Sequence, residues 1–379
     1  MEQSRVKRVK RKKNKKWLHR VLLLGLLAVF AVSGLLFWQV WDTLAGSYDP
    51  LNRGDKSKKR DEKVTIDDPF TVLLIGTDVK KASDTNWRPD VLMIASVNPK
   101  KKSMKMISVP RDTYAEIANT NGMKNKINSA AYYGEQKGVG PTTNTVETVE
   151  DFFNIPIDYY AKINFTGFMD VVDAAGGITV HNKRNFSIRL FNKMEYYEPG
   201  ELELDGRRAL GYVRERKSDP KGDQGRNERQ REVLQAVMNK MMSVKSIGKI
   251  DDVLKSVGDN VTYSFKVSDL PALQATYSEI SKENTENIEI QGENSRNNPQ
   301  NLWFFYVEDT ERLRISHILQ KHLGLPLETL EGEPFTGTSP ADEDPNTGEE
   351  GATPGEGETS PDGTSSTENG TQTPSYTQP

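Results

Sequence analysis

The longest apolar run of this chain is the feature that most limits how it can fold. Residues 21–41 read VLLLGLLAVFAVSGLLFWQVW, carry no charge, and contain only two polar side chains, Ser33 and Gln39. A helix of about 20 apolar residues crosses the roughly 30 Å hydrocarbon core of a bilayer. Trp17 precedes the run and Trp41 closes it, where aromatic side chains meet the membrane–water interface. We therefore predict one transmembrane helix; a buried core helix is disfavoured because no face of the run is polar.

The flanking charges predict how this helix is oriented. Residues 1–20 contain ten Lys or Arg and one acid, and the positive-inside rule assigns such a segment to the cytoplasm. A cleavable signal has a shorter apolar stretch and a small-residue cleavage site, which residues 44–47 (LAGS) match poorly. We therefore predict an uncleaved anchor: a single-pass protein of the cell membrane, cytoplasmic at its N-terminus and extracellular after about residue 42. Topology and anionic lipid account for the basic segment, so membrane lipid is a predicted partner and nucleic acid is not.

Composition divides the rest of the chain into three parts. Residues 42–66 are polar and indicate an extracellular linker, whereas 67–330 are long enough for one substantial core. Residues 331–379 carry eleven acids, no Lys or Arg, and much Gly, Pro, Ser and Thr. Such a segment cannot bury enough apolar surface to fold, so we predict a disordered acidic tail. The chain has no Cys and four scattered His, which excludes disulfides, thiolate metal sites and thiol nucleophiles.

Strand and helix patterns alternate within 67–330. Three short, mostly apolar runs read as buried strands, and the polar stretch between the last two predicts a hairpin turn. Further strands and five helical patterns follow. Strands interleaved with helices predict the fold class, which is α/β with a three-layer α-β-α architecture around a mixed central sheet, preceded by the transmembrane helix. The predicted strands are 70–76, 91–97, 104–109, 157–163 and 288–291, and the predicted helices are 142–153, 164–175, 226–242, 268–280 and 309–322.

Charged side chains gather where these elements begin and end. Asp78 follows the first strand, Arg88 and Asp90 precede the second, and Arg111 and Asp112 follow the third. Loops at strand ends are where α/β folds bind ligands. Carboxylates beside several guanidinium groups are what a magnesium-bound pyrophosphate requires, although each residue alone is also compatible with a surface salt bridge. A second such group lies in and after a helical stretch, in the strings Tyr212-Val-Arg214-Glu-Arg216 and Asp223-Gln-Gly-Arg226-Asn-Glu-Arg229-Gln230.

Taken together and in order, these strings resemble the LytR-CpsA-Psr family. The resemblance runs from about residue 70 to residue 240, and the N-terminal anchor fits it as well. One departure is Pro89, where the family often has Ser, and the segment 280–300 matches no family motif. The strings that carry the resemblance are Gly76-Thr-Asp78, Arg88-Pro-Asp90, Ser108-Val-Pro-Arg-Asp112, Lys126-Ile-Asn128, Val171-Val-Asp173-Ala-Ala-Gly176-Gly177, Leu204-Asp-Gly206-Arg-Arg-Ala-Leu210 and the two strings from Tyr212 to Gln230 given above.

The resemblance implies a function and a site. Family members move a glycopolymer, such as wall teichoic acid or capsular polysaccharide, from an undecaprenyl-pyrophosphate carrier to a peptidoglycan acceptor, forming a phosphodiester bond. The implied cofactor is Mg²⁺ or Mn²⁺, held by Asp78 and Asp90. The implied catalytic group is Asp90, Arg111 and Asp112, with a carboxylate, Asp90 or Asp112, available as general base. The implied pyrophosphate-binding residues are Arg88, Arg111, Lys126, Arg214, Arg216, Asp223, Arg226 and Gln230.

Three other functions remain open from the sequence. A polyprenyl-pyrophosphate-glycan hydrolase would use the same site with water in place of the sugar hydroxyl. A non-catalytic cell-envelope regulator is a second alternative, and a wall-glycan binding module is a third. The link between Arg216 and Asp223, which contains Asp219 and Pro220, is rich in Lys, Asp and Gly and is expected to be flexible.

Overall fold

The computed structural model of the chain describes residues 47–54, 56–243, 257–299 and 301–342. The predicted cytoplasmic segment, the predicted transmembrane helix and most of the predicted acidic tail lie outside these residues. Within the described ranges, no helix is long and apolar enough to cross a membrane.

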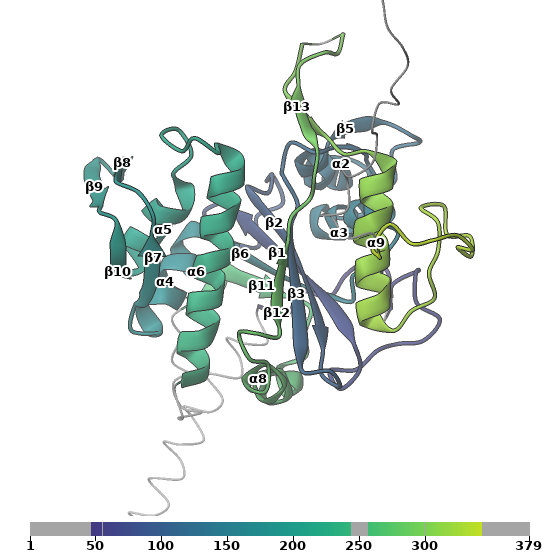
Figure 1. The fold of residues 1–379 in the computed structure, drawn as a ribbon, viewed down its shortest axis with the longest axis horizontal. Helices are drawn as coiled ribbons and strands as arrows, with labels where there is room; N and C mark the ends of the chain where they lie inside the picture. Colours follow the sequence, from purple (N-terminus) through teal and green to yellow (C-terminus); the bar gives the residue numbers. More distant parts are fainter. Residues whose placement is uncertain (1–46, 55, 244–256, 300, 343–379) are drawn as a thin grey trace, which may run out of the picture. The chain divides into compact units, whose positions relative to one another are not determined.

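The described residues form a central six-stranded sheet, four two-stranded sheets and seven α-helices (Figure 1). The helices are α2 (Ala130–Gln136), α3 (Pro141–Phe153), α4 (Phe165–Ala174), α5 (Gly206–Arg214), α6 (Asp223–Ser243), α8 (Leu270–Ser278) and α9 (Asp309–Leu323). The strands of the central sheet are β1 (Phe70–Thr77), β2 (Val91–Asn98), β3 (Ser103–Ser108), β6 (Tyr159–Asn164), β11 (Val261–Tyr263) and β12 (Thr285–Ile288). The paired short strands are β4 (Tyr114–Glu116) with β5 (Lys124–Lys126), β7 (Ile178–Asn182) with β10 (Gly200–Leu204), β8 (Phe186–Leu190) with β9 (Lys193–Tyr197), and β13 (Glu293–Ser295) with β14 (Phe304–Tyr306).

The central sheet is mixed, in the order β11-β6-β1-β2-β3-β12. β1 pairs parallel with β6 and antiparallel with β2, β2 pairs antiparallel with β3, and β3 pairs parallel with β12. The β2–β3 pairing closes at Asn98 and Ser103, so the predicted hairpin turn is confirmed. Because β1, β2 and β3 form an antiparallel meander, the end of β1, the start of β2 and the end of β3 meet at one edge of the sheet.

Helices cover both faces of this sheet, because its strands carry apolar side chains on both (Figure 1). On one face, Leu73 and Ile94 pack in a core that α3 and α9 complete with Val149 and Ile315. On the other face, apolar residues of β1 to β3 pack against α6 and α8. The predicted mixed sheet with helices around it is therefore confirmed.

A second group of elements extends from the sheet at the left of Figure 1. β7 and β10 pair, β8 and β9 form a hairpin, and both pack with α4, α5 and the middle of α6 around Tyr197 and Tyr212. The sequence did not predict these four strands. Their alternation of exposed and buried residues is short and interrupted by charges, which is weak evidence for a strand.

Local signals in the sequence explain where several helices begin and end. Pro141 is the first residue of α3, where its missing N–H costs nothing, and Asn154 ends that helix in the left-handed conformation. The side chains of Asn164 and Asp205 accept hydrogen bonds from the first turns of α4 and α5. Two elements differ from prediction by three residues: α6 begins at Asp223 rather than at residue 226, and the strand expected at 288–291 is β12 (Thr285–Ile288). The other predicted ends differ by at most two residues.

The packed region extends beyond 67–330 at both ends. Before it, Arg60 forms an ion pair with Asp158, and the buried Ser57 donates to Glu150. After it, the buried Ser339 and His317 are hydrogen-bonded at 2.8 Å between Oγ and Nδ1. Polar composition concealed these contacts because they are made by hydrogen bonds and ion pairs rather than by apolar burial.

Candidate active site at the ends of β1, β2 and β3

The predicted site residues of the first group meet at one edge of the sheet. Gly76 of β1 pairs with Val91 of β2, and the Asp90 amide donates to the Gly76 carbonyl at 2.8 Å. Asp78 and Asp90 therefore lie on neighbouring strands at the same end. β3 ends beside them, since Met93 pairs with Ser108, and Arg111 follows three residues later.

Arg111 connects the carboxylates at this edge. Its Nη1 donates to Asp90 Oδ1, and its Nε lies 3.8 Å from Asp112 Oδ2. Asp112 also accepts a hydrogen bond from Lys126 Nζ at 2.7 Å, at the end of β5. The four side chains are between 14% and 34% exposed, so solvent screens these charges only in part. The sequence motifs 88–90, 108–112 and 126–128 are thus brought together as expected.

The start of α6 supplies the second part of the cluster. Arg226 donates to Asp223 Oδ2 at 3.1 Å, and Arg216 Nη1 lies 3.5 Å from Asp223 Oδ1. Burial lowers the pKa of the Arg226 guanidinium; Asp223 opposes that shift, and the positive charges of Arg111 and Arg216 add to it. An arginine with a lowered pKa still remains protonated near neutral pH. Arg111 and Arg226 thus lie close enough to interact electrostatically.

This cluster has the electrostatics of an anion site. The guanidinium groups of Arg111, Arg216 and Arg226 and the ammonium of Lys126 pair with three carboxylates, those of Asp90, Asp112 and Asp223, which leaves one positive charge in excess. The Nε atoms of Arg111 and Arg226 are buried and, within the described residues, donate no hydrogen bond. Buried donors without an acceptor are costly, and phosphate oxygens are acceptors that fit planar guanidinium groups.

Other predicted site residues lie at the rim. Asp78 is exposed and forms no ion pair with any described residue. Arg88 lies over the Tyr132 ring at 5.8 Å, and Arg214 lies over the Phe165 ring at 4.7 Å. Gln230 donates weakly to the Val213 carbonyl at 3.5 Å. Among the residues that the structure describes, no hydrogen bond or ion pair joins Arg88, Arg214 or Gln230 to the Arg111 cluster, so for these three residues a role in the site stays a prediction.

The donor set fits a magnesium ion that is shared with a substrate. Among the described residues, no group of three or more His, Asp or Glu side chains could hold a metal ion by itself. Asp78 and Asp90 at one sheet edge provide two carboxylates. Mg²⁺ in phosphate-binding sites is commonly held by one or two carboxylates together with phosphate oxygens. The residues present therefore match that pattern, with phosphate supplying the remaining ligands.

The link between Arg216 and Asp223 is anchored, contrary to the expected flexibility. The Asp219 carboxylate is 4% exposed and pairs with Arg229 and, at 3.0 Å, with Arg184. Arg229 also donates to the Tyr212 carbonyl at 3.0 Å and to the Glu215 carbonyl. Gly225 permits this packing, because a Cβ atom there would lie 2.1 Å from Asp219 Oδ2. The buried ion pair fixes the loop that carries Arg216 and Asp223.

Arg231 is a residue that the sequence did not single out. It is buried on α6 and donates from Nη1 to Ser108 Oγ at 3.0 Å, which joins α6 to the end of β3. This contact holds the two parts of the arginine cluster at a fixed separation. Its helical spacing from Arg226 is five residues, which gave no sign that it faces the sheet.

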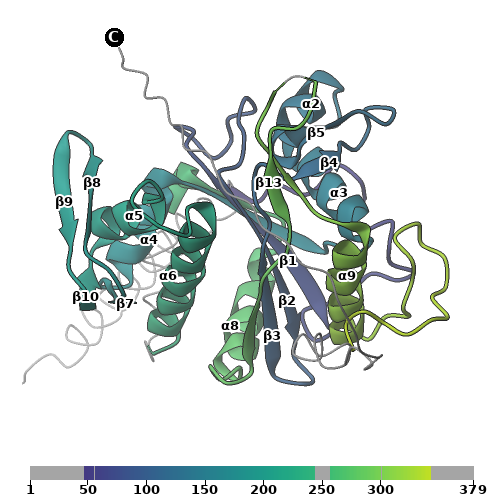
Figure 2. The same ribbon diagram turned by 45° about the horizontal axis from the view of Figure 1, so that its top comes forward.

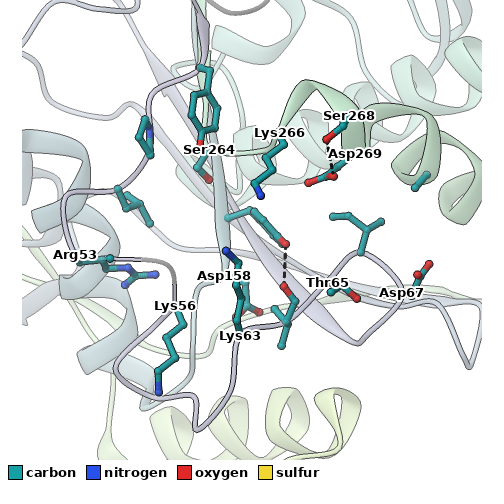
Figure 3. Close-up of a pocket in the computed structure, with 18 residues that line it drawn as sticks. Arg53, Lys56, Lys63, Thr65, Asp67, Asp158, Ser264, Lys266, Ser268 and Asp269 are labelled. Carbon is teal, nitrogen blue, oxygen red and sulfur yellow. Dashed lines mark hydrogen bonds between the residues drawn. The ribbon is translucent and has the colours of Figure 1, made fainter.

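A cavity of about 360 Å³ lies at the opposite end of the sheet (Figure 3). It is formed by the segment 48–67, the start of β6 and residues 264–272. Figure 3 shows Lys56, Lys63 and Lys266 around it together with Asp67 and Asp158. None of the predicted site residues lines this cavity, so it is separate from the arginine cluster.

Comparison with known proteins gives a consistent result. TagV of Bacillus subtilis (strain 168), named a polyisoprenyl-teichoic acid–peptidoglycan teichoic acid transferase, is 36% identical over 326 residues, which cover 84% of this chain and 82% of the relative. TagU of Halalkalibacterium halodurans, with the same activity in its name, is 38% identical over 309 residues, which cover 80% of this chain and 97% of the relative.

Solved structures agree in fold. The crystal structure of B. subtilis TagV has a TM-score of 0.60 and 35% identity, covering 68% of this chain and 98% of that one. TagT bound to LI-WTA has a TM-score of 0.60 and 29% identity, covering 73% and 100%. The model of the LytR_cpsA_psr family matches residues 35–321, which include every element that forms the arginine cluster. On the motifs, the fold and this match, the chain belongs to the LytR_cpsA_psr family.

Proposed function

We propose that this chain transfers a glycopolymer, such as wall teichoic acid, from a polyisoprenyl-pyrophosphate carrier to peptidoglycan. The observation that carries the proposal is the arginine cluster at the sheet edge, in which the buried Nε groups of Arg111 and Arg226 have no acceptor among the described residues. The names of the relatives support the same donor, acceptor and reaction class.

The proposed step exchanges one phosphorus–oxygen bond for another. The oxygen of an acceptor sugar hydroxyl forms a bond to the phosphorus that carries the glycopolymer. The bond from that phosphorus to the bridging oxygen breaks, and polyisoprenyl phosphate leaves with the electron pair. The hydroxyl proton goes to a carboxylate, for which Asp90 and Asp112 are the candidates. Arg111, Arg216 and Arg226 stabilise the charge that develops on the phosphate oxygens.

We further propose that Asp78 and Asp90 hold Mg²⁺, or Mn²⁺ in its place, together with phosphate oxygens. When bound, such an ion neutralises negative charge on the pyrophosphate. Arg88, Lys126, Arg214, Asp223 and Gln230 complete the proposed binding site. Lys126 has a defined part in it, because its ion pair with Asp112, at 2.7 Å, fixes the position of that carboxylate.

We also propose that the protein is anchored in the cell membrane by residues 21–41, with 1–20 in the cytoplasm and the catalytic domain outside. The charge-free apolar run and the ten basic residues before it support this orientation. A donor with a polyisoprenyl chain resides in the same membrane, so anchor and substrate share one surface.

A transfer assay tests the function. The purified full chain in detergent is incubated with Mg²⁺, a labelled undecaprenyl-pyrophosphate-linked glycan and peptidoglycan, and the label is followed. Label in peptidoglycan supports the transferase if it appears with the parent chain and is absent in three controls. These are the Arg111→Ala variant, a reaction with EDTA and a reaction without acceptor. Release of glycan phosphate at the same rate without acceptor would identify a hydrolase instead. If the chain binds the donor but forms no product with either Mg²⁺ or Mn²⁺, a non-catalytic binding module would be favoured.

A further inference from the structure

A second pocket opens beside the arginine cluster. It has a volume of about 190 Å³ and lies between the first half of α6, the end of β3 and the chain from β12 to β13. Figure 1 and Figure 2 show that the β12–β13 segment runs between α6 and α9. The family resemblance matched no motif to residues 280–300, and this pocket gives that segment a place in the site.

The pocket and the arginine cluster share two walls. Asp112 and Asp223 line the pocket, and the same carboxylates pair with Lys126 and with Arg226 and Arg216. Only the Asp112 and Asp223 side chains would therefore separate a group in the pocket from a phosphate bound by the arginines. A carboxylate that is already a candidate proton acceptor forms part of its boundary.

The chemistry of the pocket differs from that of the cluster. Its lining includes the neutral amides of Asn227, Gln291 and Asn294, and no hydrogen bond from these three side chains to a described residue is present. Gln224 and Glu289, also in the lining, are hydrogen-bonded to each other. Amide and carboxylate side chains donate to and accept from hydroxyl groups, and the two cations of the lining already have partners, Lys221 in Glu228 and Arg231 in Ser108.

An aromatic ring completes the lining. Phe305 is partly buried, lines the pocket, and donates from its backbone N–H to the Asp112 carbonyl at 2.9 Å. Gly292 allows this ring its position, because a Cβ atom there would lie 2.7 Å from Phe305 Cζ and 2.4 Å from the Tyr306 carbonyl oxygen. The apolar face of a sugar ring packs on such a side chain while its hydroxyls reach the polar groups.

We infer that this pocket binds a sugar ring of the hydroxyl-bearing acceptor glycan, an inference that rests on the proposed transferase function. The ring packs on Phe305, its hydroxyl and acetamido groups pair with the free amides, and its reactive hydroxyl faces Asp112. The donor glycan has the same general chemistry, but the group that attacks phosphorus must enter beside the proton-accepting carboxylate. That requirement assigns the pocket to the acceptor.

Binding and steady-state kinetics together test this assignment. The probe is a soluble N-acetylglucosaminyl–N-acetylmuramyl disaccharide fragment of peptidoglycan, titrated against the full chain in detergent by calorimetry or saturation-transfer NMR. Asn227→Ala and Gln291→Ala each remove one uncommitted amide. The matched control is Gln274→Ala, an amide on α8 outside the pocket. Thermal unfolding of each variant verifies that it is folded.

We expect each pocket variant to weaken fragment binding about five- to tenfold, the usual effect of one lost hydrogen bond, and the control to leave it unchanged. In the transfer assay the same variants should raise KM for peptidoglycan and leave KM for the donor unaltered. A rise in donor KM alone would assign the pocket to the donor glycan and overturn the inference. Unchanged binding in both variants, or no binding by the parent chain at millimolar fragment, would also overturn it. Fragment binding that weakens in the variants while the parent transfers no label would uphold the pocket and reject the proposed reaction.

Discussion

The guanidinium of Arg111 and the carboxylate of Asp90 form an ion pair that joins the end of β3 to the start of β2. Arg111 also lies beside Asp112, which Lys126 holds from β5. The pair thus connects the residues proposed to bind metal with those proposed to bind phosphate. A change at either partner alters the position of the other, so single substitutions here test the geometry of the whole sheet edge.

Asp90→Asn removes the charge of that pair and keeps its shape. Loss of one electrostatic contact to a reacting centre typically lowers the rate by about 10²–10³, and we expect a loss of that size in label transfer. The free energy of unfolding should change by less than about 1 kcal/mol, because the pair is partly exposed. Asp61→Asn, at an exposed residue outside the site, is the control. Equal transfer by parent and Asp90→Asn would remove Asp90 from the proposed machinery.

Arg226 and Arg229 lie on the same helix, but substituting them should have different effects: the first on activity and the second on stability. Among the described residues, Arg226 pairs only with Asp223, a side chain that is 34% exposed, so Arg226→Met should abolish transfer with a small loss of stability. Arg229→Met leaves the buried Asp219 and two backbone carbonyls without this partner. Breaking a buried pair costs about 3–5 kcal/mol, and Arg184, which still contacts Asp219, favours the lower end of that range.

Urea unfolding followed by circular dichroism, together with the transfer assay, separates the two variants. We expect Arg229→Met to be less stable than the parent. At low temperature, where more of the variant is folded, its transfer activity should rise in proportion to the folded fraction. If Arg229→Met were as stable as the parent but inactive, Arg229 would belong to the site rather than to the loop anchor.

His322 should make the fold sensitive to mild acid. Burial lowers its pKa to about 4, and the nearby Lys105 and Lys101 add to the shift. Its two ring nitrogens lie 2.8 Å from Ser96 Oγ and 2.9 Å from Ser103 Oγ. Because the unfolded chain binds this proton near pH 6.5, stability is complete above that pH and falls as the pH drops toward 4, by on the order of 3 kcal/mol.

Urea midpoints measured from pH 7 to pH 4 test the effect, with His322→Gln as the comparison. The variant retains a hydrogen-bonding side chain but cannot titrate in this range. Its midpoint should decline less steeply than that of the parent between pH 6.5 and pH 4.5. Parallel curves would show that other groups cause the acid sensitivity.

Lys162 is buried among apolar residues and should destabilise the fold near neutral pH. Its ammonium lies 4.7 Å from the Trp87 ring centre, and burial lowers its pKa to about 8, opposed by Asp49 and Asp84. The unfolded chain holds this proton up to about pH 10.4, so stability should rise as the pH increases from 8 to 10.

We expect Lys162→Met to raise the free energy of unfolding at pH 7 by about 1–2 kcal/mol, since the lost cation–π contact offsets part of the gain. The advantage over the parent should shrink between pH 8 and pH 10. Lys80→Met, at an exposed residue, is the control and should show no such trend. A less stable Lys162→Met at every pH would show that the ammonium has a stabilising partner.

Features with strong local signals were predictable from the sequence. The mostly apolar strands β1 and β2 and the helix α3, with Pro141 at its start, followed from the apolar pattern and the helix boundary signals. The meeting of Asp90, Arg111 and Asp112 followed from strand ends alone, because an antiparallel meander brings such ends together.

Features that depend on distant contacts were not predictable. The link that contains Asp219 was predicted to be flexible because its composition is polar. The partners that anchor Asp219, Arg184 and Arg229, are 35 and 10 residues away in the sequence. The chain near Gly292 read as featureless because the strand β13 exists only through its pairing with β14. In both places the decisive energy comes from a partner that local periodicity does not reveal.

The packing of residues 47–66 onto the domain would limit the distance between the domain and the proposed membrane anchor. Tyr48 bridges to Tyr263, and the Asp49 backbone and carboxylate accept hydrogen bonds from Tyr160 Oη at 2.7 Å. In the anchored form proposed above, only residues 42–47 separate the apolar run from Tyr48, a span of at most about 25 Å. New polymer would then be deposited on the innermost glycan strands, and outward growth of the wall would carry it away from the membrane.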